Sequence, residues 1–217
     1  MMESVATLLA RGELLLQVSD SAALDTELLL AYTLDIDRTW LKTWPNHQPV
    51  TEQIATFEQL LLRRLNGEPI AFIIGTQGFW TLNLKVSPQT LIPRPETELL
   101  VETALKIWKP ANCRALDLGT GSGAIALALA SERPGWQLTA VDSIDGAVQL
   151  AEINRQNCQL DNVAIYQSDW FKQIPKTDGE SKYHLIISNP PYIEVGDPHL
   201  KQGDVRFEPE SALVPGL

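Results

Sequence analysis

The stretch that decides the fold is residues 117–123, which read Asp117-Leu118-Gly119-Thr120-Gly121-Ser122-Gly123. It follows the apolar residues of a predicted strand, 114–118, and precedes a predicted helix, 124–133. Three glycines at alternate positions let the backbone turn tightly and let a ligand approach it closely. The GxGxG spacing differs from the GxGxxG of dinucleotide enzymes, and no GK[ST] ending of a phosphate loop follows. By itself, such a turn is only a weak indication of a cofactor site.

Strand and helix signals alternate from residue 112 onward. The expected strands are 114–118, 138–142, 163–167 and 183–187, and the expected helices are 124–133 and 146–157. Residues 172–182 are polar and are expected to form a loop. Alternation at this period predicts an α/β fold, with a parallel sheet covered by helices on both faces.

The N-terminal part of the chain has a different pattern. Residues 4–18, residues 21–36 and a stretch from Thr51 to Gly67 carry apolar residues at helical spacing. Short amphipathic helices bury their apolar stripes against each other, which predicts a small helical domain over residues 1–74. Apolar and polar residues then alternate over 79–86, a strand signal that predicts a β-hairpin linker over 75–92. Residues 93–217 would form the sheet domain.

Composition restricts the class of protein. The chain has 217 residues, 44% of them apolar and 20% charged, as in ordinary globular proteins. No apolar run approaches the roughly 18 residues of a membrane span, and a signal-peptide pattern is missing, so we expect a cytoplasmic protein without a membrane partner. Cys113 and Cys158 lack metal-ligand spacing, and we expect no metal site. The net charge of −10 argues against nonspecific DNA binding.

Acidic and aromatic residues follow the next two predicted strands. Asp142 ends the second strand, about 20 residues beyond the glycine loop, where a carboxylate can accept hydrogen bonds from a ribose. Asp169 and Trp170 follow the third strand and can hold an adenine. Ligands bind outside the carboxyl ends of such strands, and these residues describe a pocket without a phosphate clamp. S-adenosylmethionine fits this description, because Asp117 would favour its positive sulfonium.

The fourth predicted strand leads into Ser188-Asn189-Pro190-Pro191-Tyr192. The prolines end the strand and make the loop rigid, so a polar side chain, a fixed backbone and an aromatic ring meet at a pocket for a flat polar group. Together with the glycine loop, this arrangement resembles the Rossmann-like, S-adenosylmethionine-dependent methyltransferases. An NPPY loop at this place is similar to that of methyltransferases acting on planar nitrogens, either adenine N6 in nucleic acid or the glutamine amide.

Three further stretches narrow the choice. They are GEPIAFIIG at 67–75, PRPETE at 93–98 and GDVRFEP at 203–209. All three are similar to signatures of the release-factor glutamine methyltransferase family, and the resemblance runs from the helical domain to the last residue. Members of that family use S-adenosyl-L-methionine to methylate the glutamine of the GGQ motif in class-1 peptide chain release factors. The ribosomal-protein glutamine methyltransferases share NPPY, but their pattern lacks the full PRPETE run.

The resemblance implies roles for individual residues. The cofactor, whose product is S-adenosyl-L-homocysteine, would be lined by Asp117, Gly119, Thr120, Gly121, Ser122, Gly123, Asp142, Asp169, Trp170 and Asn189. The substrate glutamine would be held by Asn189, Pro190, Pro191 and Tyr192. In our interpretation the Asn189 side-chain oxygen and the Pro190 carbonyl accept the two amide N–H bonds, and Tyr192 packs on the amide plane. Asn189, Pro190 and Tyr192 are therefore the candidate catalytic residues, and residues 1–74 would recognise the substrate.

Two alternatives stay open. A nucleic-acid adenine methyltransferase is compatible with NPPY alone, although the acidic charge and the missing recognition domain argue against it. The second alternative is a binding module without activity. It arises because the sequence ends at Leu217, shortly after the fourth strand. The family's sheet continues through a fifth strand and an antiparallel pair, so we expect a sheet truncated at the C-terminus, with an exposed edge. A chain with an incomplete sheet could bind its ligand and lack activity.

Overall fold

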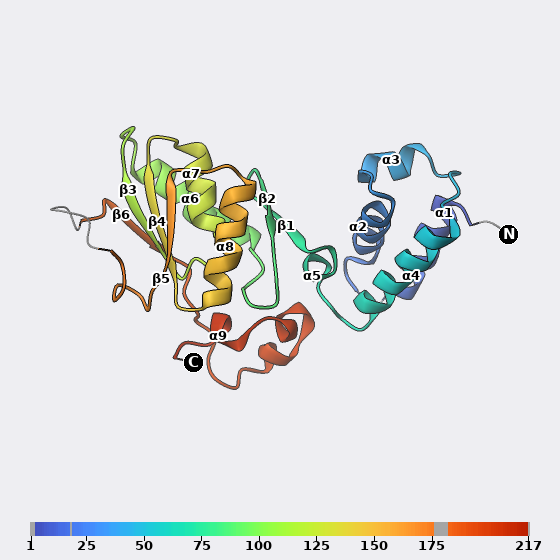
Figure 1. Ribbon diagram of the computed structural model, residues 1–217. Coiled ribbons are helices and arrows are strands. Elements are labelled where there is room, and N and C mark those ends of the chain that lie inside the picture. The colour runs from blue at the N-terminus through green and yellow to red at the C-terminus, as the bar shows by residue number, and fades with distance from the viewer. Residues whose placement is uncertain (1–2, 18, 176–181, 217) are drawn as a thin grey trace. The chain divides into compact units, whose positions relative to one another are not determined.

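The computed structural model describes residues 3–17, 19–175 and 182–216. The chain divides into two compact units, Met1–Ile74 and Gly75–Leu217 (Figure 1). Along the described ranges, no helix is long and apolar enough to cross a membrane, and no three or more His, Cys, Asp or Glu side chains group as metal ligands would.

The first unit is helical. Its helices are α1 (Val5–Leu15), α2 (Ala22–Leu34), α3 (Arg38–Thr43), α4 (Thr51–Leu65) and α5 (Ile70–Ile74). Apolar side chains from α1, α2 and α4, such as Leu8, Leu29 and Phe57, are fully buried together, as the helical spacing predicts. Helices α3 and α5 were not expected, since neither is long enough to show a periodic pattern.

The second unit begins with an antiparallel hairpin of β1 (Thr76–Phe79) and β2 (Leu82–Lys85). A hairpin was expected here, but the single strand predicted over 79–86 is wrong, because the chain turns at Trp80, whose φ is +58°. The Trp80 amide donates to the Glu98 carboxylate at 2.7 Å, and its indole Nε1 donates to Glu132 at 2.8 Å. These bonds hold a backbone conformation that the alternating pattern does not reveal.

The rest of the second unit is built on a parallel sheet. Its strands are β3 (Arg114–Leu118), β4 (Gln137–Asp142), β5 (Val163–Gln167) and β6 (Leu185–Ser188), in the order β5-β4-β3-β6. Three helices accompany it, α6 (Glu98–Ile107), α7 (Ala124–Glu132) and α8 (Asp145–Asn157) (Figure 1). The expected α/β class and parallel sheet are confirmed.

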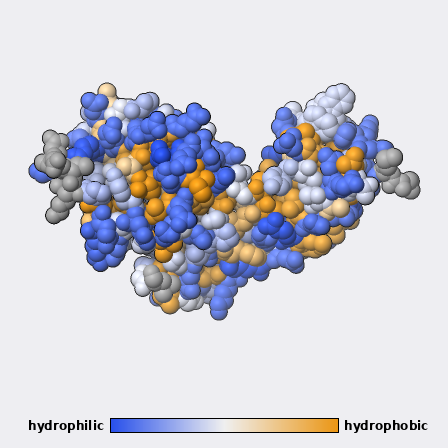
Figure 2. All heavy atoms as spheres, viewed as in Figure 1, coloured by the Kyte–Doolittle hydropathy of each residue, from blue (hydrophilic) through white to orange (hydrophobic). Residues whose placement is uncertain are grey.

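The two faces of this sheet are covered differently. Ala115, Ala140 and Ile187 face the main core, to which α7 contributes an almost wholly buried run of apolar residues. On the other face, Leu116, Leu118 and Val141 pack with Ile174 and Tyr183. Within the described residues, the expectation of helices on both faces is therefore wrong, because these two side chains lie where a second helical layer was expected. On the view in Figure 2, hydrophobic and hydrophilic residues are interspersed over this unit.

After β6 the chain forms η2 (Pro198–Lys201), η3 (Gly203–Phe207) and α9 (Glu210–Leu213). The backbone amides of Tyr192 and Ile193 donate to the Leu213 carbonyl at 3.1 and 2.9 Å. Residues 211–216 are thereby brought next to the loop that follows β6.

Candidate active site

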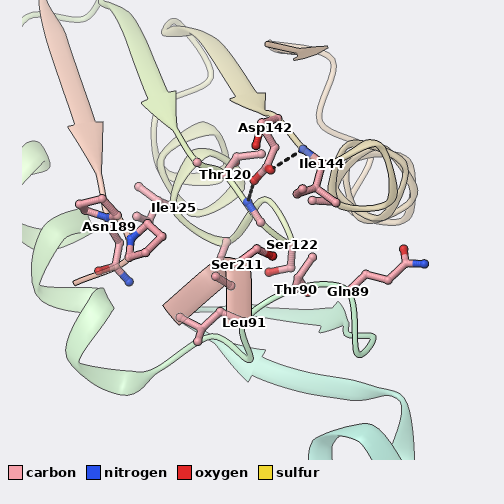
Figure 3. A pocket seen from close by; sticks show the side chains of 18 of the residues that line it. Gln89, Thr90, Leu91, Thr120, Ser122, Ile125, Asp142, Ile144, Asn189 and Ser211 are labelled. Carbon is pink, nitrogen blue, oxygen red and sulfur yellow. Dashed lines mark hydrogen bonds between the residues drawn. The ribbon is translucent and has the colours of Figure 1, made fainter. Parts of the chain in front are cut away.

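A cavity of about 470 Å³ lies in the second unit, where β3, β4, β5 and β6 end. Its walls come from the glycine loop, the ends of β4 and β5, the loop after β6, the segment 89–97 and residues 211–216. The lining residues are Gln89, Thr90, Leu91, Pro93, Arg94, Thr97, Gly119, Thr120, Gly121, Ser122, Ala124, Ile125, Asp142, Ser143, Ile144, Ala147, Ser168, Asp169, Trp170, Asn189, Pro190, Pro191, Ser211, Ala212, Val214, Pro215 and Gly216. In the view of Figure 3, Asn189 lies on the left of the cavity, Thr90 and Ser122 lie to the right, and Asp142 lies above.

The glycine loop turns because its glycines adopt left-handed backbone conformations. Gly119, Gly121 and Gly123 have φ values of +72°, +56° and +88°. A Cβ on Gly123 would also lie 3.0 Å from Leu127 Cδ1, so the Leu127 side chain would have to shift to make room for it. Gly119 and Thr120 both donate to the Val141 carbonyl at 2.9 Å, which fixes the loop beside the end of β4.

Asp142 reaches this loop from the end of β4. Its Oδ2 accepts from the Gly121 amide at 2.9 Å, and its Oδ1 accepts from the Ile144 amide at 3.0 Å (Figure 3). A carboxylate has about four lone-pair sites, so both oxygens can still accept from a ligand hydroxyl. Asp142 therefore lies in the cavity wall with acceptor capacity left for a ligand.

Asp117 lies behind the loop instead of in the cavity wall. Its carboxylate is buried, and Oδ2 accepts from the Thr120 hydroxyl at 2.7 Å. Burial raises the pKa of Asp117 to about 6, an effect that the hydrogen bond from Thr120 partly offsets. Neither Asp117 nor Gly123 is among the lining residues, so we assign both a supporting place behind the loop.

Asp169 and Trp170 line the cavity after the end of β5. Trp170 has a φ of +52°, and the buried Ser168 hydroxyl donates to its carbonyl at 2.7 Å, which holds this turn. Asp169 accepts from the Lys172 ammonium at 2.6 Å. Trp170 is 49% exposed, so a flat ring is available at the cavity edge.

The loop after β6 contributes Asn189, Pro190 and Pro191 to the lining. Asn189 Nδ2 donates to the Thr97 hydroxyl oxygen at 3.3 Å. Tyr192 is different, because its side chain lies outside the lining residues and the residue is 80% exposed. The structure therefore brings three members of the NPPY loop to the cavity and leaves the fourth at the surface.

The wall formed by residues 89–97 was not predicted as part of the site. The Arg94 guanidinium donates to the Glu208 carboxylate, whose side chain is 0% exposed, and so joins the PRPETE run to the GDVRFEP run. Burial raises the pKa of Glu208, although the charge of Arg94 opposes this. The Thr90 hydroxyl oxygen is buried without a partner within the described residues. In the sequence, the PRPETE run was recognised as a family signature. No residue spacing predicted that this segment would lie beside the glycine loop.

Comparison with known proteins gives the family. A family model described as "PrmC N-terminal domain" matches residues 7–75, and one described as "Methyltransferase small domain" matches residues 95–203. The release factor glutamine methyltransferase of Pseudomonas aeruginosa is 54% identical over 215 residues, which are 99% of this chain and 76% of that protein. The chain belongs to the release factor glutamine methyltransferase family.

A second relative, the release factor glutamine methyltransferase of Shewanella oneidensis, is 54% identical over 196 residues, 90% of this chain and 67% of that protein. A solved structure, the Pyrococcus abyssi tRNA (uracil-54, C5)-methyltransferase in complex with S-adenosyl-L-homocysteine, has a TM-score of 0.37 and 17% identity. The match covers 43% of this chain and 23% of the chain in that structure.

The chain is an S-adenosyl-L-methionine-dependent methyltransferase. The residues of the cavity fit this cofactor. Arg94 is the one Lys or Arg among the lining residues that the structure describes, and it is paired with Glu208, so a nucleotide phosphate would meet no free cation there. Asp142 offers a carboxylate for ribose hydroxyls, and the unpartnered Thr90 hydroxyl offers one more polar contact.

Proposed function

We propose that the chain methylates the side-chain amide nitrogen, N5, of the glutamine in the GGQ motif of class-1 peptide chain release factors, and so supports translation termination. The observation that carries the proposal is the place of Asn189 and Pro190 in the wall of the same cavity as the glycine loop and Asp142. The names of the relatives, which are release factor glutamine methyltransferases, agree with it. Such a reaction belongs in the cytoplasm.

The chemistry of the acceptor explains why this loop suits it. An amide nitrogen is a poor nucleophile, because its lone pair is delocalised into the carbonyl. The cofactor supplies an electrophilic methyl group on a positively charged sulfur. The protein must therefore position the amide nitrogen against the methyl group. In well-oriented model reactions, such positioning lowers the activation barrier by about 7–11 kcal/mol.

The residues of the loop would divide this task. Asn189 Oδ1 and the Pro190 carbonyl would accept the two N–H bonds of the glutamine amide and fix its plane. Tyr192, a residue that is 80% exposed, would pack on that plane once a protein partner brings the glutamine in. Residues 1–74 would recognise the release factor.

The test uses labelled S-adenosyl-L-methionine with either a class-1 release factor or duplex DNA as the acceptor. We expect methyl transfer to the release factor alone, and a loss of at least about 100-fold in Asn189→Ala. Calorimetry should show that this variant still binds the cofactor. Asn157→Ala, at an exposed position of α8, is the matched control and should keep wild-type turnover. Wild-type turnover in Asn189→Ala, or methylation of DNA instead, would contradict the proposal.

A further inference from the structure

Thr97 lies at the junction of η1 (Pro95–Thr97) and α6, and it lines the cavity next to Asn189 of the loop after β6. A threonine just before a helix ordinarily caps it, with its hydroxyl accepting from a backbone amide of the first turn. Thr97 makes no such cap, because its own backbone is already helical, with φ −69° and ψ −21°. Its hydroxyl instead accepts a hydrogen bond from Asn189 Nδ2 at 3.3 Å, across 92 residues of sequence.

We propose that Thr97 is a positioning residue, which holds the Asn189 amide with its oxygen facing the acceptor nitrogen. This inference rests on the proposed glutamine methylation. Asn189 has an N–H donor side and an oxygen acceptor side. With the nitrogen bound to Thr97, the oxygen is left for a ligand that donates, as a glutamine amide nitrogen does. The reverse orientation would set Asn189 N–H groups against the N–H groups of the acceptor.

The turn formed by residues 94–97 fixes the position of the Thr97 hydroxyl. The Thr97 amide donates to the Arg94 carbonyl at 3.0 Å. The Arg94 side chain is in turn fixed by its ion pair with Glu208, which has no exposed side-chain area. Pro95 restricts the backbone between Arg94 and Thr97. The PRPETE run thus presents one hydroxyl to Asn189 from a turn with little freedom.

The test compares Thr97→Val, which removes the hydroxyl at nearly constant shape, with Thr97→Ser, which keeps it. We expect Thr97→Val to lower kcat for release-factor methylation about three- to tenfold, the effect of one hydrogen bond. Thr97→Ser should stay close to the wild type. Cofactor affinity should be unchanged in both variants. The thermal midpoint of Thr97→Val should fall by no more than the roughly 2–4 °C that one hydrogen bond accounts for, and that of Thr97→Ser should stay at the wild-type value. Thr103→Val, at an exposed position of α6, is the matched control.

A second measurement does not depend on turnover. In ¹H–¹⁵N spectra of the full chain, the Asn189 side-chain NH₂ signals should shift in Thr97→Val and should keep their wild-type position in Thr97→Ser. Unchanged Asn189 signals in Thr97→Val would overturn the role of Thr97. An equal loss of kcat and cofactor affinity that serine does not restore would do the same. If the wild type leaves the glutamine unmodified while these signals shift as expected, the proposed acceptor fails and the Thr97–Asn189 contact stands.

Discussion

Asn154 in α8 joins three parts of the second unit, and its replacement by leucine tests whether this junction supports the cofactor loop. The side chain is buried, with 1% of its surface exposed. Its Oδ1 accepts from the Lys85 amide at 2.7 Å, and its Nδ2 donates to the Lys85 carbonyl at 3.0 Å. The same Nδ2 donates to the Ser122 carbonyl at 2.9 Å, inside the glycine loop.

Leucine has a similar volume but can make none of these three bonds. At about 1 kcal/mol for each hydrogen bond, the loss is about 3 kcal/mol. In a protein of this size, 1 kcal/mol lowers the thermal midpoint by about 2–4 °C, so we expect a decrease of about 6–12 °C. Ser122 lines the cavity, and we therefore expect weaker cofactor binding as well.

Thermal unfolding and calorimetry of cofactor binding measure the two effects. Asn157→Leu, three residues further along α8 and exposed, is the matched control, and it should change the stability by less than about 0.5 kcal/mol. If Asn154→Leu unfolds at the wild-type temperature and binds the cofactor with wild-type affinity, the junction has no role and the reasoning is refuted.

Three further predictions concern charged groups of the site. Asp142→Ala should weaken S-adenosyl-L-methionine binding about 10- to 100-fold by calorimetry, since a charge-assisted partner is lost, and unchanged affinity would remove Asp142 from the site. The pKa of Asp117 is raised to about 6, so the wild type should lose stability as the pH rises from about 4 to about 6, and urea unfolding of Asp117→Asn should show a smaller loss. Arg94→Leu leaves the Glu208 carboxylate buried and unpaired, at a cost of about 3–5 kcal/mol, which the added change Glu208→Gln should partly restore. Additive effects of those two changes in denaturant unfolding would show that the pair is not coupled.

Much of the sheet and part of the cavity lining were predictable from the sequence. Gly121, Asp142, Trp170 and Asn189 each follow a predicted strand, and the carboxyl ends of parallel strands meet at one edge of a sheet. Local patterns and one topological rule were therefore enough to bring these residues together.

The remaining wall depends on contacts between distant parts of the chain. Arg94 and Glu208 are 114 residues apart, and Thr97 and Asn189 are 92 residues apart, so no local period relates them. Asp117 was expected in the cofactor wall because it begins the glycine loop. In a strand, however, alternate side chains share a face, so Asp117 points with Ala115 toward the main core, where it is buried.

The most direct test of the central claim is peptide mass spectrometry of a class-1 release factor incubated with this chain and S-adenosyl-L-methionine. We predict one added methyl group on the glutamine of the GGQ motif with the wild-type chain, and no added methyl group with Asn189→Ala. An unmodified glutamine under conditions where the wild type binds the cofactor, or a methyl group on a different residue, would contradict it.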